Sequence, residues 1–433
     1  MVKSIMLPFS NMEKYIRTHL QYNITANLID GTLFGLALGF ASFSTIVPLF
    51  VSKLTDSAIL IGLAPAFHSI GWQLPQLFNA GHIARAREYK PMVLRNTIHE
   101  RVPFLVLALT AFLLPWIGVK TALIVIFIAL AWQGIGGGFT ANPWTSLVSK
   151  IIPSESRGTF FGIQGGLVNL AISFSAIGAG YLLDKVNYPN NFALSFLIAS
   201  IALVASYIAI SKTREPKDTE KIIPAEQTHF WQDAKSILVK DHNFNWFLVV
   251  RFLSQFATMG FGFYILLGLR RFNMDTITAG YLTAALTLTQ TFANAGMGWL
   301  GDKIGHRAML ILGAVASILS SIIAWFAPSI IWLYPVFILA GFGNVAIWTI
   351  GITFTVGFGT ETERPTYIGL SNTLITPATI FAPILGGWMI DSLGFEPTFA
   401  LSVLIGVITA GILILVVKDP LPHPNPLPQG EGT

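Results

Sequence analysis

Hydrophobic residues run in long blocks separated by short polar stretches, and twelve of these blocks carry almost no charge. The blocks occupy residues 24–51, 58–80, 97–119, 121–146, 158–183, 192–211, 244–269, 276–300, 308–328, 330–358, 366–390 and 397–417. Each block can cross a bilayer, because a spanning helix needs about 20 apolar residues. Runs such as 121–131 lack the alternation typical of barrel strands. The pattern therefore predicts an all-α membrane protein with 12 transmembrane helices.

Composition agrees with this prediction and excludes a soluble chain. Of the 433 residues, 53% are hydrophobic and 11% are charged, whereas soluble domains carry about 25% charged residues. So little charge cannot cover two or three soluble domains with a water-compatible surface. The chain has no cysteine, which excludes disulfides, thiolate metal sites and a cysteine nucleophile.

The distribution of lysine and arginine among the loops predicts the orientation. With twelve spans, both termini lie on one side, and 19 loop cations lie on that side against five on the other. Cytoplasmic loops carry the excess of positive charge, so we expect both termini in the cytoplasm and the protein in the plasma membrane. The formal charge of +5 comes from this bias, and we expect no nucleic-acid partner.

The polar segments suggest a division of the chain. We expect a cytoplasmic N-terminus at 1–23, a six-helix half at 24–211, a cytoplasmic linker at 212–243, a second six-helix half at 244–417 and a disordered Pro-rich tail at 418–433. Within the linker, apolar residues from Phe230 to Leu238 recur at helical spacing. This spacing predicts a short interfacial helix.

An internal repeat supports two related halves. At a constant shift of 207 residues, Gly134 falls on Gly341, Arg157 on Arg364 and Asp184 on Asp391. Further matches include three more glycine pairs and the Phe-Ala-Leu-Ser runs that begin at 192 and 399. Random similarity between apolar helices would not align Arg, Asp and Gly at one offset, so the repeat indicates two pseudo-symmetric bundles.

The segment 298–307, which reads GWLGDKIGHR, resembles the signature loop of the major facilitator superfamily. In that family the loop follows the second helix of each half, and here it follows the eighth span. The resemblance makes Gly298, Gly301, Asp302, Lys303, Gly305 and Arg307 candidates for a conformational-loop motif. It implies two six-helix bundles with a substrate bound near the bilayer midplane.

The first-half copy of this loop, 81–90, keeps Gly81 and the final base Lys90. It has Arg85 where the family has Asp and Glu88 where the family has Gly. We therefore do not expect the family's acidic contact in this loop.

Two charged residues lie well inside the predicted spans. Asp30 is about two turns into the first span, and Arg251 is about two turns into the seventh, the matching helix of the other half. Intramembrane charges commonly mark pathways or relays. We expect them to face each other across the two halves as a gate, or Asp30 to bind a proton or cation; a static structural pair is the alternative. The run His99-Glu100-Arg101 is interpreted as a cluster at the membrane interface.

Polar and aromatic side chains form stripes on several spans. In the family, helices at these positions line or flank the central cavity, so the stripes are candidates for a substrate path. The candidates, besides Asp30 and Arg251, are His68, Trp72, Gln76, Gln133, Trp144, Gln255, Gln290, Asn294, Asn344 and Trp348. The alternative is hydrogen bonding between packed helices. The run 131–136, AWQGIG, resembles the family's fourth-helix motif but lacks the basic residue upstream; helix packing through small residues explains it equally well.

No catalytic set or phosphate-binding loop is found in the sequence. We expect no enzyme activity, no cofactor and no metal site. The favoured function is a monomeric secondary transporter that moves a small organic molecule across the bilayer by alternating access, with protons as the candidate coupling ion. Import and export both remain open. The alternative is a non-transporting sensor or assembly protein of the same fold.

Overall fold

A computed structural model describes residues 11–83, 86, 88–216, 230–359 and 363–420. All the regular elements within these residues are helices. The first part of the chain forms α1 (Asn11–Phe40), α2 (Ile46–Ser52), α3 (Ala58–Ile83), α4 (Lys90–Ile151), α5 (Ser154–Lys185) and α6 (Asn190–Ser211). The helix predicted in the central polar segment is present as α7 (Phe230–Lys240).

The second part of the chain contains more interrupted helices. It forms α8 (His242–Ala257), η1 (Met259–Phe263), α9 (Tyr264–Phe272), α10 (Thr276–Ile304), α11 (His306–Phe326), η2 (Ile330–Trp332), α12 (Leu333–Val345), the π-helix η3 (Ala346–Ile350), α13 (Gly351–Val356), α14 (Arg364–Leu393) and α15 (Phe395–Leu415). The seventh and tenth predicted spans are therefore each assembled from several pieces. Such interruptions free backbone groups that side chains can then bind.

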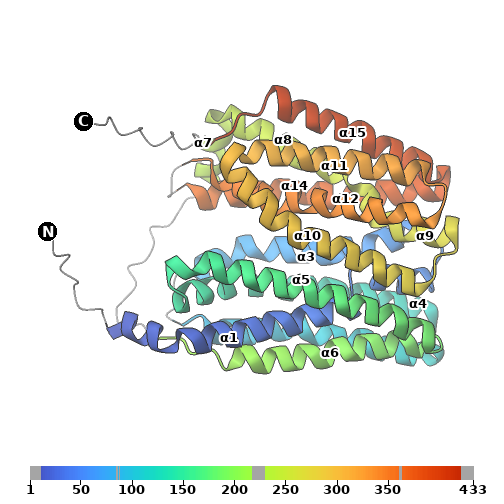
Figure 1. The fold of residues 1–433 in the computed structure, drawn as a ribbon, viewed down its shortest axis with the longest axis horizontal. Coiled ribbons are helices and arrows are strands. Elements are labelled where there is room, and N and C mark those ends of the chain that lie inside the picture. Colours follow the sequence, from blue (N-terminus) through green and yellow to red (C-terminus); the bar gives the residue numbers. More distant parts are fainter. Residues whose placement is uncertain (1–10, 84–85, 87, 217–229, 360–362, 421–433) are drawn as a thin grey trace, which may run out of the picture.

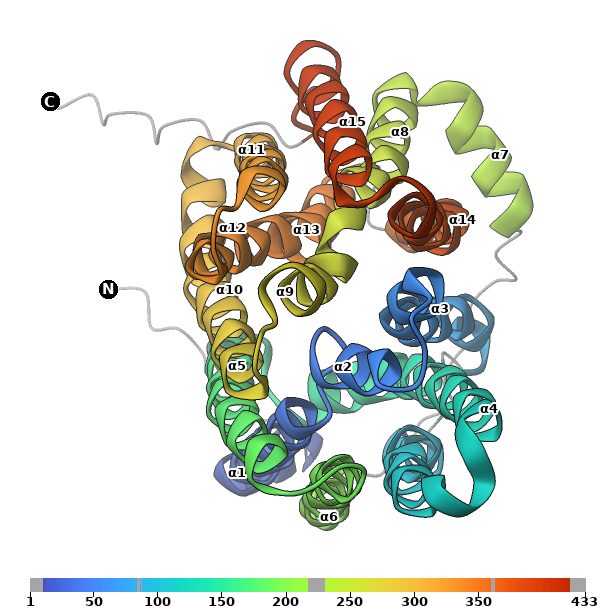
Figure 2. The same cartoon turned by 90° about the vertical axis from the view of Figure 1, so that its right-hand side faces the viewer.

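The long helices lie side by side, with both chain ends at the same end of the molecule (Figure 1). We call this end the terminal end and the opposite end the distal end. Viewed along the helices, α1 to α6 occupy one side of the molecule and α11 to α15 the other (Figure 2). We call the helices α1 to α6 the N-group and the helices α8 to α15 the C-group. The groups meet where α5 packs on α10 and α3 packs on α14.

Eight helical segments within the described residues are long and apolar enough to cross a membrane. Large apolar side chains also point outward from them: Ile128 is 62% exposed, Phe174 is 73% exposed and Leu415 is 83% exposed. A soluble protein rarely shows so many exposed apolar residues on its long helices. The chain is an integral membrane protein.

Two predicted spans differ in their bounds from the helices that contain them. The first span was expected at 24–51, but α1 already begins at Asn11 and ends at Phe40, and α2 is a separate helix. The third span was expected to begin at 97, but α4 begins at Lys90, with a proline next in its first turn. The third and fourth spans are joined into one 62-residue element that bends at Gly118, where φ is 76°. Glycine tolerates this left-handed conformation.

The two groups touch each other from the middle of the bundle to the distal end. The hydroxyls of Thr45 and Thr283 are 2.7 Å apart, and so are those of Ser173 and Thr287. At the distal end, the hydroxyls of Tyr181 and Tyr281 are 2.8 Å apart. Hydrogen bonds between described residues of the two groups are confined to this region.

Toward the terminal end, α5 and α10 separate (Figure 1). Near the distal end the two backbones touch, because a Cβ added at Gly280 of α10 would lie 2.6 Å from the carbonyl oxygen of Ala176. Near the terminal end, a Cβ added at Gly165 or Gly166 of α5, or at Gly298 of α10, would meet nothing within 4 Å. The bundle is closed at its distal end and open between α5 and α10 at its terminal end.

A clamp fastens the segment after α6 to the start of the N-group. The Asn23 side chain donates to the backbone oxygen of Arg214 (2.9 Å) and accepts from its N–H (2.8 Å). The next residue, Glu215, accepts the backbone N–H groups of Tyr89 and Lys90 at 2.9 and 2.8 Å. A carboxylate at a helix start neutralises unpaired N–H groups and the helix dipole, so Glu215 caps α4.

The C-group contains the same arrangement. The Asn243 side chain donates to the backbone oxygen of Lys418 (2.9 Å) and accepts from its N–H (2.8 Å). Asp419, the next residue, accepts the backbone N–H of Arg307 in the first turn of α11, at 3.5 Å. In each group, an asparagine on the first helix and an acid after the last helix make these contacts. They join α1, α4 and the end of α6 in the N-group, and α8, α11 and the end of α15 in the C-group.

Candidate functional site

A cavity of about 460 Å³ lies inside the N-group. Its walls come from α1, α3, α4, α5 and the end of α6, and they combine aromatic, polar and charged side chains. Trp72, Trp144 and Asp30, three of the sequence-predicted candidates, line it together. Ligand sites are typically largely apolar cavities of this size with a few convergent polar groups.

The charged part of the cavity wall is a buried ion pair. Nη2 of Arg101 lies 3.0 Å from Oδ1 of Asp30 and 2.9 Å from the hydroxyl oxygen of Ser206. That hydroxyl also donates to Oδ1 of Asp30 at 2.5 Å. The side chains of Arg101 and Asp30 are only 9% and 8% exposed. The guanidinium also lies over the Phe34 ring, 5.4 Å from its centre, so α1, α4 and α6 are joined by one polar contact.

A second carboxylate adjoins this pair. Oε2 of Glu100 accepts from the Thr97 hydroxyl at 3.3 Å and lies 3.8 Å from Nη1 of Arg101. Its side chain is 14% exposed and forms part of the cavity wall. With both acids ionised, the cluster of Asp30, Glu100 and Arg101 has a formal charge of −1. A buried unbalanced charge is costly.

The predicted pairing of Asp30 with Arg251 was wrong for this conformation, since the partner of Asp30 is Arg101. Glu100 and Arg101 were predicted to form a cluster at the membrane interface, and the structure buries both side chains inside the N-group, where they are 14% and 9% exposed. Because α4 begins at Lys90, these two residues lie about ten residues, or 15 Å, inside the helix.

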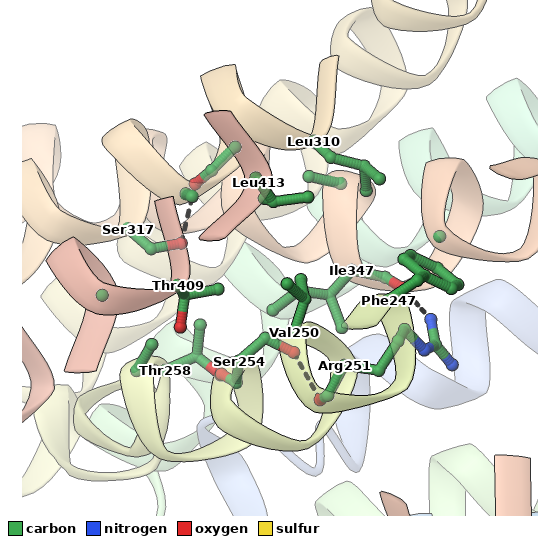
Figure 3. Close-up of a pocket in the computed structure, with 16 residues that line it drawn as sticks. Phe247, Val250, Arg251, Ser254, Thr258, Leu310, Ser317, Ile347, Thr409 and Leu413 are labelled. Atoms are coloured by element: carbon green, nitrogen blue, oxygen red, sulfur yellow. Dashed lines mark hydrogen bonds between the residues drawn. The ribbon is translucent and has the colours of Figure 1, made fainter. Parts of the chain in front are cut away.

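Arg251 lies in the C-group beside the π-helical turn η3. Its Nη1 donates to the backbone oxygen of Ile347 at 2.7 Å (Figure 3). Its Nη2 lies 3.5 Å from Oδ1 of Asn372. A π-helical turn changes the i→i+4 bonding of the backbone, and here a carbonyl of that turn binds the guanidinium. Arg251 is 3% exposed and lies at one side of a small, mostly apolar cavity of about 40 Å³ (Figure 3).

His68 and Gln133 contact each other, with Nδ1 and Oε1 2.5 Å apart. The His68 ring also stacks on Phe43, with centroids 4.0 Å apart. The run after Gln133 is a packing surface: a Cβ at Gly134 would lie 2.5 Å from the backbone oxygen of His68. These residues hold α3 against α4, and neither His68 nor Gln133 lines the 460 Å³ cavity.

The remaining candidates lie mostly in the C-group and are not gathered into one cavity. Oε1 of Gln255 accepts from Thr379 at 3.4 Å, and Oδ1 of Asn294 accepts from Thr349 at 2.7 Å. Partly buried positions are also found for Gln290, Asn344 and Trp348. The side-chain surroundings of Gln76, on α3 of the N-group, lie outside the described residues.

The signature-like segment forms a tight joint between α10 and α11. The helices are separated by Gly305 alone, where φ is 98°. Asp302 lies 3.5 Å from Nε2 of His306, and Nζ of Lys303 lies 3.7 Å from the centre of the Trp299 ring. Gly298 and Gly301 belong to the last turns of α10.

Arg307 joins this segment to the end of α15. Its Nε donates to the backbone oxygen of Leu413 at 2.8 Å, and its Nη2 donates to that of Ile414. Cations commonly satisfy carbonyls at helix ends in this way. In the first-half copy, the backbone N–H of Lys90 donates to Glu215. The surroundings of Gly81 lie outside the described residues.

Several cavity residues were not among the sequence predictions. Glu100, Arg101, Phe34, Phe161, Gln164 and Asn169 line the cavity. The aromatic and amide residues sit in ordinary amphipathic positions, so the sequence gives no signal that separates them from packing residues.

The sequence profile described as Major Facilitator Superfamily matches residues 92–275 and 247–433. The multi-drug resistance efflux pump PmrA of Streptococcus pneumoniae is 25% identical over 327 residues, which cover 72% of this chain and 77% of that protein. The MFS-type transporter ppzB of Metarhizium rileyi is 24% identical over 151 residues, 34% of this chain. The match spans 31% of that fungal protein.

Solved structures of low sequence identity share the fold. A D-xylose-proton symporter aligns with a TM-score of 0.72 at 13% identity and covers 93% of this chain and 99% of its own. The nucleoside transporter NupG aligns with a TM-score of 0.70 at 13% identity and covers 91% of this chain and 100% of its own. These similarities concern the fold alone.

Proposed function

Because this chain belongs to the major facilitator superfamily, we propose that it is a secondary active transporter that moves a small organic molecule by alternating access. Relatives with named activities are transporters, including the pneumococcal efflux pump. The 460 Å³ cavity, with its aromatic and polar walls, has room for such a substrate.

The observation that supports alternating access is the one-sided contact between the two groups. Hydrogen bonds such as Thr45 to Thr283 close the distal end, while α5 and α10 separate toward the terminal end (Figure 1). Rocking the groups about the middle of α5 and α10 would break the distal contacts and close the terminal end. Small, rigid interfaces of this kind favour two discrete arrangements over continuous bending.

We further propose that the two groups are pseudo-symmetric six-helix bundles with twelve spans in total. The kinked α4 then contributes two spans, so the eight long apolar segments give nine spans. The helices α1, α3 and α10 bring the total to twelve. The paired clamps of Asn23 and Asn243 support the repeat. The excess of loop cations at the terminal end supports a cytoplasmic location for that end and a plasma-membrane location for the protein.

Proton coupling is part of the proposal. A proton on Glu100 would leave the cluster of Asp30, Glu100 and Arg101 neutral, which suits a membrane interior. One of the structural neighbours is a D-xylose-proton symporter, so the fold is compatible with this energy source.

The test is flux through purified protein in proteoliposomes, with a panel of radiolabelled organic solutes and with or without a pH gradient. We expect at least one solute to be accumulated only when the gradient is imposed, and accumulation to collapse on adding a protonophore. Empty liposomes and the Asp30→Asn variant are the controls. If no solute of a broad panel moves, the second candidate, a non-transporting sensor or assembly protein of this fold, replaces the proposal.

A further inference from the structure

We propose that the N-group cavity binds an organic cation, with Glu100 as the carboxylate that pairs with its positive charge and Trp72 as the aromatic wall beside it. This inference rests on the proposed function and specifies its substrate class. It starts from the charges of the cavity wall: two carboxylates and one guanidinium face the same space.

The two acids are not equivalent. Oδ1 of Asp30 lies 3.0 Å from Nη2 of Arg101 and accepts from the Ser206 hydroxyl at 2.5 Å. Glu100 has only a long 3.8 Å contact with the same guanidinium and a 3.3 Å contact with Thr97. Arg101 therefore pairs more closely with Asp30, and the negative charge of Glu100 remains unbalanced.

Gly137 brings Glu100 and Trp72 together on the cavity wall. A Cβ built on Gly137 would be 3.1 Å from Oε1 of Glu100 and 3.1 Å from Cδ1 of Trp72. Those contacts would be tighter than ordinary van der Waals contact, so the glycine lets the carboxylate and the indole lie close together on the wall of the cavity. An ammonium group in the cavity would gain an ion pair at Glu100, and a cation–π contact where it lies over the face of the Trp72 ring.

The rest of the wall favours an amphipathic cation. Trp144 and Phe161 form an edge-on aromatic pair with centroids 6.0 Å apart, and both line the cavity. Gln164 and Asn169 add polar groups to the α5 side. Arg101 is held against Asp30 and Phe34, so an anionic ligand would find its cation already paired and would face Glu100.

The experiment measures binding of three compounds with the same ring to the purified full-length protein in detergent by isothermal titration calorimetry. The probes are benzyltrimethylammonium, benzyl alcohol and benzoate. We expect saturable binding of the ammonium compound, with benzyl alcohol about tenfold or more weaker and benzoate weaker still. Equal binding of benzyl alcohol, or preferred binding of benzoate, would overturn the inference.

Variants assign the interaction to the two residues. Glu100→Gln is expected to weaken binding of the ammonium compound about tenfold or more, and Trp72→Leu about fivefold; Glu100→Asp should retain part of the affinity. Glu396→Gln, a change at an exposed acid in the first turn of α15, should bind like the parent. If Glu100→Gln elutes as an aggregate, Trp72→Leu decides the outcome, and unchanged affinity there overturns the inference.

The same preparations separate this inference from the proposed transport. Binding of the ammonium compound without flux of any solute would retain the cation site and reject transport. Gradient-driven flux of neutral or anionic solutes that Glu100→Gln leaves unchanged would retain transport and reject the cation site.

Discussion

Asp391, in the last turn of α14, accepts the first backbone N–H of α3 from Ala58 at 2.8 Å. The helix start of one group is therefore capped by a side chain of the other. Arg270 lies 3.5 Å from the same carboxylate and donates to the backbone oxygen of Asp56. These contacts join the two groups at the closed distal end, so we expect Asp391 to act as a latch on that state.

Replacing Asp391 should shift the protein toward a distally open state. Loss of a helix cap costs about 1 kcal/mol, which corresponds to a population change of about fivefold. In Asp391→Ala, a single cysteine introduced at the buried Thr283 should react about fivefold faster with a membrane-impermeant maleimide added from the distal side. The repeat-related Asp184→Ala is the matched control, because Asp184 contacts the neighbouring Lys185 at 3.3 Å in an exposed position. Equal acceleration in both variants would contradict the latch.

Cross-linking the distal end should stop transport. The natural absence of cysteine allows a pair to be introduced at Thr45 and Thr283, whose hydroxyls are 2.7 Å apart. Oxidation of Thr45→Cys/Thr283→Cys should abolish proteoliposome flux, and a reductant should restore it, because the disulfide holds two groups that must separate. Each single cysteine variant should be insensitive to oxidant. Full flux through a quantitatively cross-linked protein would refute alternating access at this interface.

Removing only the arginine of the Asp30–Arg101 pair should destabilise the protein more than removing both charges. Arg101→Ala leaves the Asp30 carboxylate buried without its cation, a defect that costs about 3–5 kcal/mol. The double variant Asp30→Asn/Arg101→Gln removes both charges and should recover most of this loss. Unfolding free energy measured by denaturant titration in detergent tests the cycle, and a double variant as unstable as Arg101→Ala would rule out the charge explanation.

Gly351 should be essential for the position of Arg251. A Cβ at Gly351 would overlap Nη1 of Arg251, so Gly351→Ala should displace the guanidinium from the Ile347 carbonyl and destabilise the protein by about 1–3 kcal/mol. Gly411→Ala, at a position in α15 where a Cβ meets nothing within 4 Å, should be neutral or stabilise by up to about 1 kcal/mol. If the melting temperatures of the two variants change by the same amount, the Arg251 contact contributes nothing to stability.

The clamp of the N-group predicts a local change in backbone protection. In Glu215→Gln the charge that faces the start of α4 is lost, so the amide protons of Tyr89 and Lys90, which it accepts at 2.9 and 2.8 Å, should exchange faster by about threefold to tenfold. Hydrogen–deuterium exchange read by mass spectrometry measures this effect. In Asp419→Asn the first turn of α11 should change instead, and the Tyr89 peptide should stay at the parent rate.

The α-helical class and the signature-like segment were predictable, whereas the candidate site was only partly so. Asp30, Trp72 and Trp144 were selected from their position on apolar helices, and the structure brings them to one cavity. Arg101 was missed because hydropathy does not fix helix starts: seven further residues at the beginning of α4 convert an interfacial arginine into a buried one. His68 was selected on the same grounds as Trp72, but it faces Gln133 and Phe43. Helical periodicity gives a face, and the neighbour of that face depends on helix rotation and packing.

The sequence by itself determined that the chain is helical and membrane-embedded, because long uncharged runs can satisfy their backbone groups in lipid only within helices. The internal repeat also related the first half of the chain to the second half. The tertiary structure decided which charges meet: Asp30 pairs with Arg101 three helices away in chain order, and Asp391 caps α3 across the two groups. A buried charge needs a partner at about 3 Å, and which side chain reaches that distance depends on how the helices rotate and pack against one another.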